Sequence, residues 1–83
     1  MNRKVFLEIC AGDRDGNIRF AELRAVLRAL GFVERVRGSH HIFAKPGVAE
    51  ILNLQPKGAS AKPYQVKQVR KVIQKYALAS EEE

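Results

Sequence analysis

The chain of 83 residues has room for one small domain, and its 46% hydrophobic content is ordinary for a globular protein. It contains no run of 18 apolar residues that could span a membrane, and the apolar stretch after the first basic residues is too short for a signal peptide. We therefore expect a cytoplasmic protein that does not bind membranes. The single cysteine, Cys10, excludes an internal disulfide and forms no metal cluster with the histidines, so we expect neither a metal nor another cofactor.

The formal net charge of +6 is unevenly distributed along the chain. Residues 45–80 carry seven lysines and arginines and a single acidic residue, Glu50, and an acidic tail follows in residues 79–83. A basic C-terminal half favours a polyanionic partner, of which nucleic acid is the simplest. The alternative is a lysine-rich helix face that contacts only water.

The N-terminal half has the hydrophobic spacing of helices. A short helix is predicted over residues 3–10, with Cys10 as a small hydrophobic residue on its buried face. A cluster of Asp and Gly over residues 12–17 predicts a turn after it. A second helix is predicted over residues 20–30, and Gly31 gives it a stop signal.

The hydrophobic pattern after this second helix becomes that of strands. Residues 32–37 and 40–44 are two strand-like runs joined at Gly38, which predicts a hairpin. A third strand is expected at residues 50–54, and a loop at residues 55–62.

The last predicted element is a helix over residues 63–78, with Pro63 in the favourable first position. Its basic side chains lie off the apolar stripe and are expected to face outward: Lys67, Arg70, Lys71 and Lys75. The order of a short helix followed by α-β-β-β-α predicts an α+β fold in which the helices cover one face of a three-stranded antiparallel sheet. That order resembles the double-stranded-RNA-binding domain, whose last helix presents basic residues to phosphates.

Residues 11–22 can be aligned with the twelve-residue calcium loop of an EF-hand. Asp13, Asp15 and Glu22 then occupy ligand positions, but the first position, which requires a carboxylate, holds Ala11. Two arginines add positive charge to the same stretch. We prefer the interpretation that this segment is an Asp/Gly turn leading into a helix.

Two adjacent histidines, His40 and His41, follow the predicted hairpin turn and lie close to Arg37. Neighbouring residues of a strand point to opposite faces, so only one of the two can share a face with Ile42. A histidine titrates near neutral pH and can accept a proton from a ribose 2′-hydroxyl. A nearby arginine would hold a phosphate and stabilise negative charge in the transition state. On the residues alone, a structural role for the pair is the preferred interpretation, because a histidine pair on a strand is more often structural than catalytic.

The strings L-G-F-V-E-R at residues 30–35 and G-S-H-H-I-F at residues 38–43 resemble the HicA family of bacterial and archaeal mRNA interferase toxins. The resemblance covers residues 18–78 of a single domain, after an N-terminal extension of residues 1–17. It implies a fold like the double-stranded-RNA-binding domain, the activity of an endoribonuclease toxin of a type II toxin–antitoxin system, and a HicB antitoxin that covers the active face.

By this resemblance the catalytic histidine is His40, presented by Gly38 and Ser39, and no catalytic role falls on His41. The third strand lacks the Pro-x-His turn that is common in the family, so a second acid–base group is not assigned. We expect His40 to activate the 2′-hydroxyl of RNA without a metal. The phosphates would be held by Ser39 and by six basic residues: Arg37, Lys45, Lys57, Lys62, Lys67 and Lys71. The alternatives are a non-catalytic RNA-binding module of the same fold and a protein-interaction subunit whose basic face meets an acidic partner.

Overall fold

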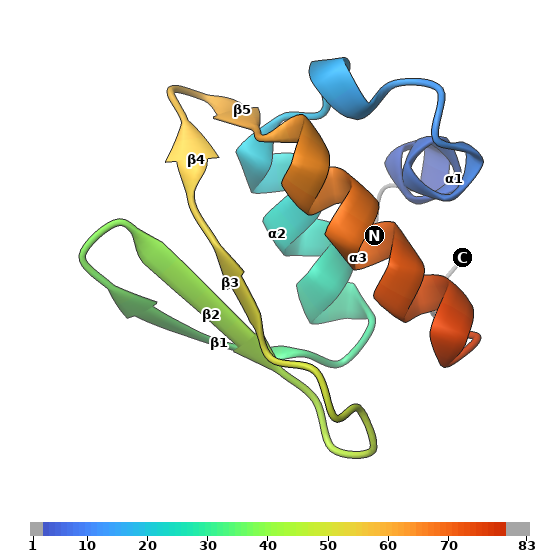
Figure 1. Ribbon diagram of the computed structural model, residues 1–83, viewed down its shortest axis with the longest axis vertical. Helices are drawn as coiled ribbons and strands as arrows, with labels where there is room; N and C mark the ends of the chain where they lie inside the picture. The colour runs from blue at the N-terminus through green and yellow to red at the C-terminus, as the bar shows by residue number, and fades with distance from the viewer. Residues whose placement is uncertain (1–2, 80–83) are drawn as a thin grey trace.

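The computed structural model describes residues 3–79. Its elements, in chain order, are α1 (Arg3–Ala11), a 3-10 turn η1 (Asp15–Asn17), α2 (Phe20–Ala29), β1 (Val33–Arg37), β2 (His40–Ala44), β3 (Leu52–Leu54), β4 (Pro56–Lys57), β5 (Ser60–Ala61) and α3 (Pro63–Lys75) (Figure 1). The predicted α+β class and the α-β-β-β-α order are confirmed. No helix within residues 3–79 has the length and apolar character needed to cross a membrane.

Strands β1, β2 and β3 form one antiparallel sheet with β2 in the centre. The predicted hairpin joins β1 to β2 with Arg37 opposite His40, and Gly38 adopts the positive φ of +60° that such a turn favours. On the other side of β2, Ile42 faces Asn53 of β3. This register decides which side chains share a face of the sheet.

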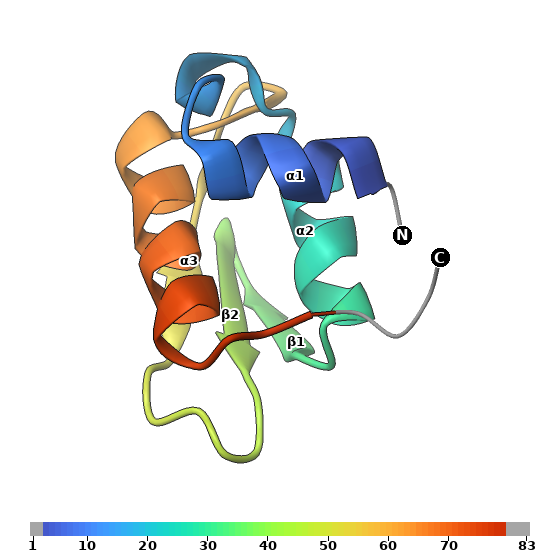
Figure 2. The same ribbon diagram turned by 90° about the vertical axis from the view of Figure 1, so that its right-hand side faces the viewer.

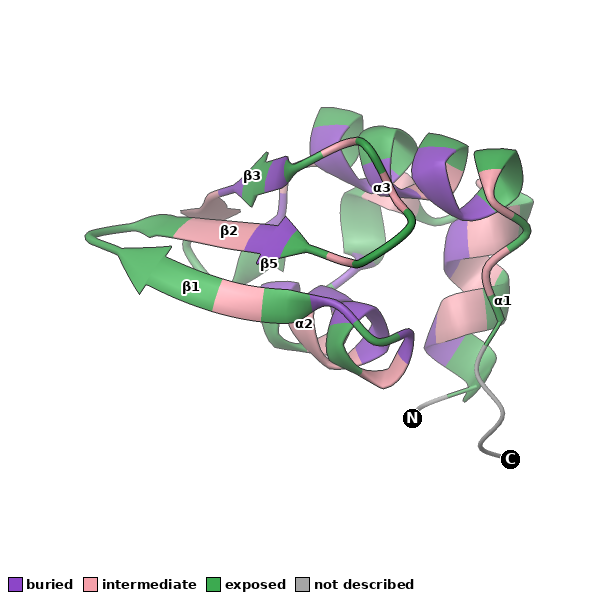
Figure 3. Cartoon of the chain, turned by 90° about the horizontal axis from the view of Figure 1, so that it is seen from below, coloured by how far each residue is buried: buried purple, intermediate pink, exposed green. Residues whose placement is uncertain are grey.

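One face of the sheet packs under α2 and α3, as Figures 1 and 3 show. Phe43, Leu52 and Leu54 are fully buried on this inner face and belong to a core shared with the two helices. The opposite face carries residues of the alternate positions and is mostly exposed along β1 (Figure 3). The α-β-β-β-α core therefore leaves one face of its sheet open, as predicted.

Helix α1 lies across α2 and α3 on their side away from the sheet (Figure 2). It buries Val5 and Ile9 against the core, and Cys10 packs at the edge of that contact. Burial raises the pKa of the Cys10 thiol, as expected for a residue that packs rather than reacts. The N-terminal extension is thus a third layer.

The predicted outward orientation of Arg70 is wrong. Its guanidinium donates to both carboxylate oxygens of Asp15, at 2.9 and 3.1 Å, and to the carbonyl oxygen of Ile9 at 3.1 Å. Arg70 therefore links α3 to η1 and α1. The same contact occupies the Asp15 carboxylate in the segment that could be aligned with a calcium loop, and within residues 3–79 no three His, Cys, Asp or Glu side chains are grouped as metal ligands.

The third strand is shorter than predicted, and Glu50, which was expected to begin it, instead contacts the end of α3. Its carboxylate accepts hydrogen bonds from Lys75 at 2.8 Å and from the Tyr76 hydroxyl at 2.6 Å, which lower its pKa to about 2. Strand β3 begins at Leu52. The predicted loop over residues 55–62 also differs, because it contains the two-stranded sheet of β4 and β5.

Helix α3 ends three residues before its predicted end. Ala77 adopts a positive φ of 49°, and the N–H of Leu78 donates to the carbonyl oxygen of Ile73 at 2.9 Å. These features form a Schellman motif, which ends a helix and usually places glycine where this chain has alanine. Because alanine stands where glycine is usual, the helix end has no recognisable stop signal in the sequence.

Candidate active site on the open face of the sheet

His40 lies at the start of β2, on the open face of the sheet, and its side chain is exposed. The hairpin turn places it directly opposite Arg37 on β1, and Ile42 follows two residues later on the same face. His41 points to the inner face. The prediction that the two histidines face opposite sides is confirmed.

Both ring nitrogens of His40 contact amide side chains. Nδ1 lies 3.0 Å from Asn53 Oδ1, and Nε2 lies 3.0 Å from the amide nitrogen of Gln55. Nδ1 therefore faces an amide oxygen, which can only accept a hydrogen bond, and Nε2 faces an amide nitrogen, which can only donate one. The Gln55 amide nitrogen also donates to Ser39 Oγ at 3.2 Å.

The backbone that carries Asn53 and Gln55 is fixed by α3. Gln65, in the first turn of α3, is 5% exposed. Its Oε1 accepts from the Gln55 N–H at 3.1 Å, and its Nε2 donates to the Asn53 carbonyl oxygen at 3.5 Å. Lys62, just before α3, donates from Nζ to Gln55 Oε1 at 3.4 Å. Helix α3 therefore determines where the partners of His40 lie.

The side chain of His41 belongs to a charged cluster between the sheet and α2. Its Nδ1 lies 2.7 Å from Glu34 Oε2, and Arg24 donates to both oxygens of Glu34 at 2.7 and 3.0 Å. The Arg24 guanidinium, followed by His41, lowers the pKa of Glu34 to about 2. The edge of the His41 ring contacts Phe20, with ring centroids 4.9 Å apart. These contacts give His41 a role in packing.

The predicted phosphate-binding residues are not all gathered around His40. Arg37 and Ser39 flank it, and Lys62 reaches it through Gln55. Lys57 is exposed on β4, directly after this segment. Lys45 instead follows the opposite end of β2 and lies against Gly31, where an added Cβ would be 2.7 Å from Nζ.

Two further predicted residues, Lys67 and Lys71, are exposed on α3 and extend the basic surface away from the sheet. Sequence reasoning missed Asn53, Gln55 and Gln65. The alternation of polar and buried residues along β3 was the available signal for the first two, since Asn53 and Gln55 flank a buried leucine. It also missed Arg35, which the register places on the open face opposite Ile42.

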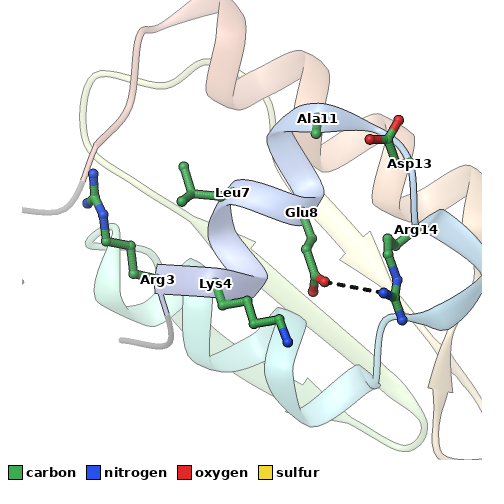
Figure 4. A pocket seen from close by; sticks show the side chains of 7 residues that line it. All are labelled: Arg3, Lys4, Leu7, Glu8, Ala11, Asp13 and Arg14. Carbon is green, nitrogen blue, oxygen red and sulfur yellow. Dashed lines mark ion pairs between the residues drawn. The ribbon is translucent and has the colours of Figure 1, made fainter.

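A hollow of about 600 Å³ lies along α1 (Figure 4), the helix on the far side of the molecule from the sheet (Figure 2). Five of the seven residues that line it are charged, the exposed Leu7 lies among them, and Arg14 and Glu8 form an ion pair of 3.7 Å at its border. The residues around this hollow are Arg3, Lys4, Leu7, Glu8, Ala11, Asp13 and Arg14. None of them contacts His40 or its amide partners, so the hollow is separate from the candidate site.

The chain matches a known protein family. Residues 20–74 match a family model described as the HicA toxin of bacterial toxin–antitoxin systems. The matched segment runs from the start of α2 almost to the end of α3, and it leaves α1 outside. No curated protein and no solved structure matches the chain.

Proposed function

The chain belongs to the HicA toxin family of bacterial toxin–antitoxin systems, and from this premise we propose that it is an endoribonuclease that cleaves mRNA at His40. Toxins of this family are generally mRNA-cleaving ribonucleases that pair with HicB antitoxins. The observation that carries the proposal is the exposed imidazole on the open sheet face, held on one side by Asn53 and facing Arg37 across the hairpin.

The proposed reaction begins with removal of a proton from the ribose 2′-hydroxyl by His40 Nε2. The 2′-oxygen then attacks the adjacent phosphorus, the bond from phosphorus to the 5′-oxygen breaks, and the leaving oxygen takes a proton from the imidazolium or from water. The products are a 2′,3′-cyclic phosphate and a 5′-hydroxyl end. General acid–base catalysis of this kind accelerates a reaction by about 10²–10⁴-fold, or roughly 3–5 kcal/mol.

The positive charge needed to hold RNA lies on the same side of the sheet. Arg35 and Arg37 are exposed on β1, and Lys57 and Lys62 lie in the segment that follows β3. Guanidinium and ammonium groups at these positions would bind backbone phosphates and stabilise the charge of the phosphorane. RNA binding should therefore weaken steeply with rising salt.

We propose that a HicB-type antitoxin neutralises the toxin by covering this face. The open face combines arginines with the exposed Val33 and the half-buried Ile42, so a partner with acidic and apolar side chains would fit it. Induction of the protein should arrest growth, and co-expression of the cognate antitoxin should restore it.

The decisive experiment compares a labelled RNA with its all-deoxy analogue in the presence of EDTA. We expect the protein to cleave only the RNA, and His40→Ala to bind RNA but cleave it about 10²–10⁴-fold more slowly. Cleavage at the wild-type rate by His40→Ala would show that the histidine assignment is wrong. Binding without cleavage by the wild type would leave an RNA-binding module of the same fold.

A further inference from the structure

The hydrogen bonds around His40 form a chain whose direction is set at one end by a lysine. An ammonium group can only donate, so the contact of 3.4 Å between Lys62 Nζ and Gln55 requires the amide oxygen of Gln55 to face the lysine. The amide nitrogen of Gln55 must then point the other way, toward Ser39 Oγ at 3.2 Å and His40 Nε2 at 3.0 Å. The orientation of this amide is therefore not free.

The orientation of Gln55 in turn decides which nitrogen of His40 carries the proton. Because the amide nitrogen donates to Nε2, that nitrogen must present its lone pair, and the single proton of the neutral ring lies on Nδ1. The 3.0 Å contact of Nδ1 with Asn53 Oδ1 is a hydrogen bond only in this tautomer. Each bond of the chain from Lys62 to Asn53 has the same polarity.

We infer that Lys62 and Gln55 are positioning residues that select the tautomer of His40 in which Nε2 is unprotonated. A histidine side chain in water favours the other tautomer, whose Nε2 carries the proton and could not act as a base. In the free protein the Gln55 N–H occupies the donor position that the 2′-hydroxyl of RNA would take during the reaction. The catalytic meaning of this selection rests on the proposed ribonuclease function, whereas the tautomer itself is a property of the protein without RNA.

The surrounding structure keeps this chain in place. Gln65 is buried and bonds to the backbone N–H of Gln55 and the backbone carbonyl oxygen of Asn53, so the backbone from which both amide side chains extend is held against α3. Lys62 immediately precedes the first helical residue of α3, which fixes the origin of its side chain. The three elements that supply the chain meet at one end of the sheet.

His41 provides an internal reference. Its Nδ1 lies 2.7 Å from Glu34 Oε2, and a carboxylate can only accept, so His41 also carries a proton on Nδ1, for an unrelated reason. The chain contains two histidines, so nitrogen spectra of the imidazole rings show these two residues alone. A change that acts through Gln55 should alter the signals of His40 and leave those of His41 in place.

The test is a measurement of ring ¹⁵N chemical shifts in the labelled protein at about pH 8.5, which is roughly two units above the ordinary pKa of a histidine side chain. We expect wild-type His40 to have its proton on Nδ1. In Gln55→Glu the carboxylate can only accept, so the polarity reverses and the proton should move to Nε2. Lys62→Met, which keeps the length of the side chain but removes the donor, should give a mixture of tautomers. Unchanged His41 signals would show that each variant is folded.

Two results would overturn the inference: a wild-type His40 protonated mainly on Nε2, or a tautomer that Gln55→Glu does not change. In cleavage assays Gln55→Glu should lose about 10²–10⁴-fold in kcat, since a wrong tautomer alone has an effect of that order in serine proteases. If the wild type does not cleave RNA, the ribonuclease proposal fails while the ¹⁵N result still decides the tautomer. The two failures are therefore distinguishable.

Discussion

His40 and His41 are neighbours in the chain but lie in two different environments. His41 faces the helices, is 16% exposed in its side chain, and is held by a carboxylate that an arginine also binds. His40 faces outward and is held by two neutral amides. The pleat of one strand therefore assigns one imidazole to packing and leaves the other accessible to a substrate. Residue type alone could not distinguish them, whereas the partners of each ring do.

The inner histidine depends on Glu34, and removal of that carboxylate should have the largest effect on stability. Glu34→Gln should lower the free energy of unfolding at pH 7 by about 3 kcal/mol, because it leaves Arg24 and His41 without their charged partner. The pKa of Glu34 is lowered from 4.5 to about 2, so its stabilisation is complete above about pH 4.5 and is lost as the pH falls toward 2.

Urea unfolding of the wild type and Glu34→Gln at pH 7 and near pH 2.5 would measure this difference. The difference in the free energy of unfolding between the two proteins should be smaller at the lower pH. His40→Ala is the matched control, since its side chain is exposed and its loss should change stability by less than about 0.5 kcal/mol. An equal difference in the free energy of unfolding at both pH values would mean that the Glu34 charge does not stabilise the fold.

A substitution of His41 itself should have a smaller effect on stability and none on chemistry. His41→Ala removes the hydrogen bond to Glu34 and the ring contact with Phe20, which should cost about 1–2 kcal/mol. The rate of RNA cleavage per folded molecule should remain within about twofold of the wild type, in contrast to His40→Ala. A folded His41→Ala protein that no longer cleaves RNA would contradict the division of roles between the two rings.

The sequence was sufficient to predict the three helices, the hairpin and the opposite orientations of His40 and His41, but not strands β4 and β5. Hydrophobic periodicity located the helices and the hairpin, and strand alternation separated His40 from His41. The end of α3 was missed because Ala77 adopts a positive φ, a backbone conformation for which glycine is the usual sequence signal. The outward orientation of Arg70 was wrong because its partner, Asp15, lies 55 positions away in the chain.

The hydrogen-bond partners of His40 were also missed because they are distant from it in the sequence. Asn53 and Gln55 reach the ring from 13 and 15 positions away, and only the register of β2 with β3 brings them there. Gln65 reaches the segment of Asn53 and Gln55 from α3, and the local sequence pattern gives no sign of this contact. Local physics therefore predicted that the two rings lie on opposite faces of the strand, while the contacts that position His40 depend on the tertiary structure.

The smallest expected effect concerns the charges beside the outer histidine. Arg37→Gln should weaken RNA binding by about three- to tenfold at moderate salt and lower the slope of log affinity against log salt by about 0.7, the contribution of one phosphate contact to single-stranded nucleic acid. The free energy of unfolding should change by less than about 0.5 kcal/mol, because Arg37 is exposed at the end of the hairpin. Binding titrations with labelled RNA at several salt concentrations measure both quantities.

Lys4→Gln is the matched control for this charge, since Lys4 is exposed on α1, on the far side of the molecule from the open face. Both variants remove one positive charge, so a general loss of attraction would affect them equally. If RNA contacts the open face, Arg37→Gln should lower the slope of log affinity against log salt, and Lys4→Gln should leave this slope unaltered. Equal slopes of log affinity against log salt for the two variants would mean that RNA binding depends only on the net charge of the protein. The proposal that RNA binds at the open face would then be wrong.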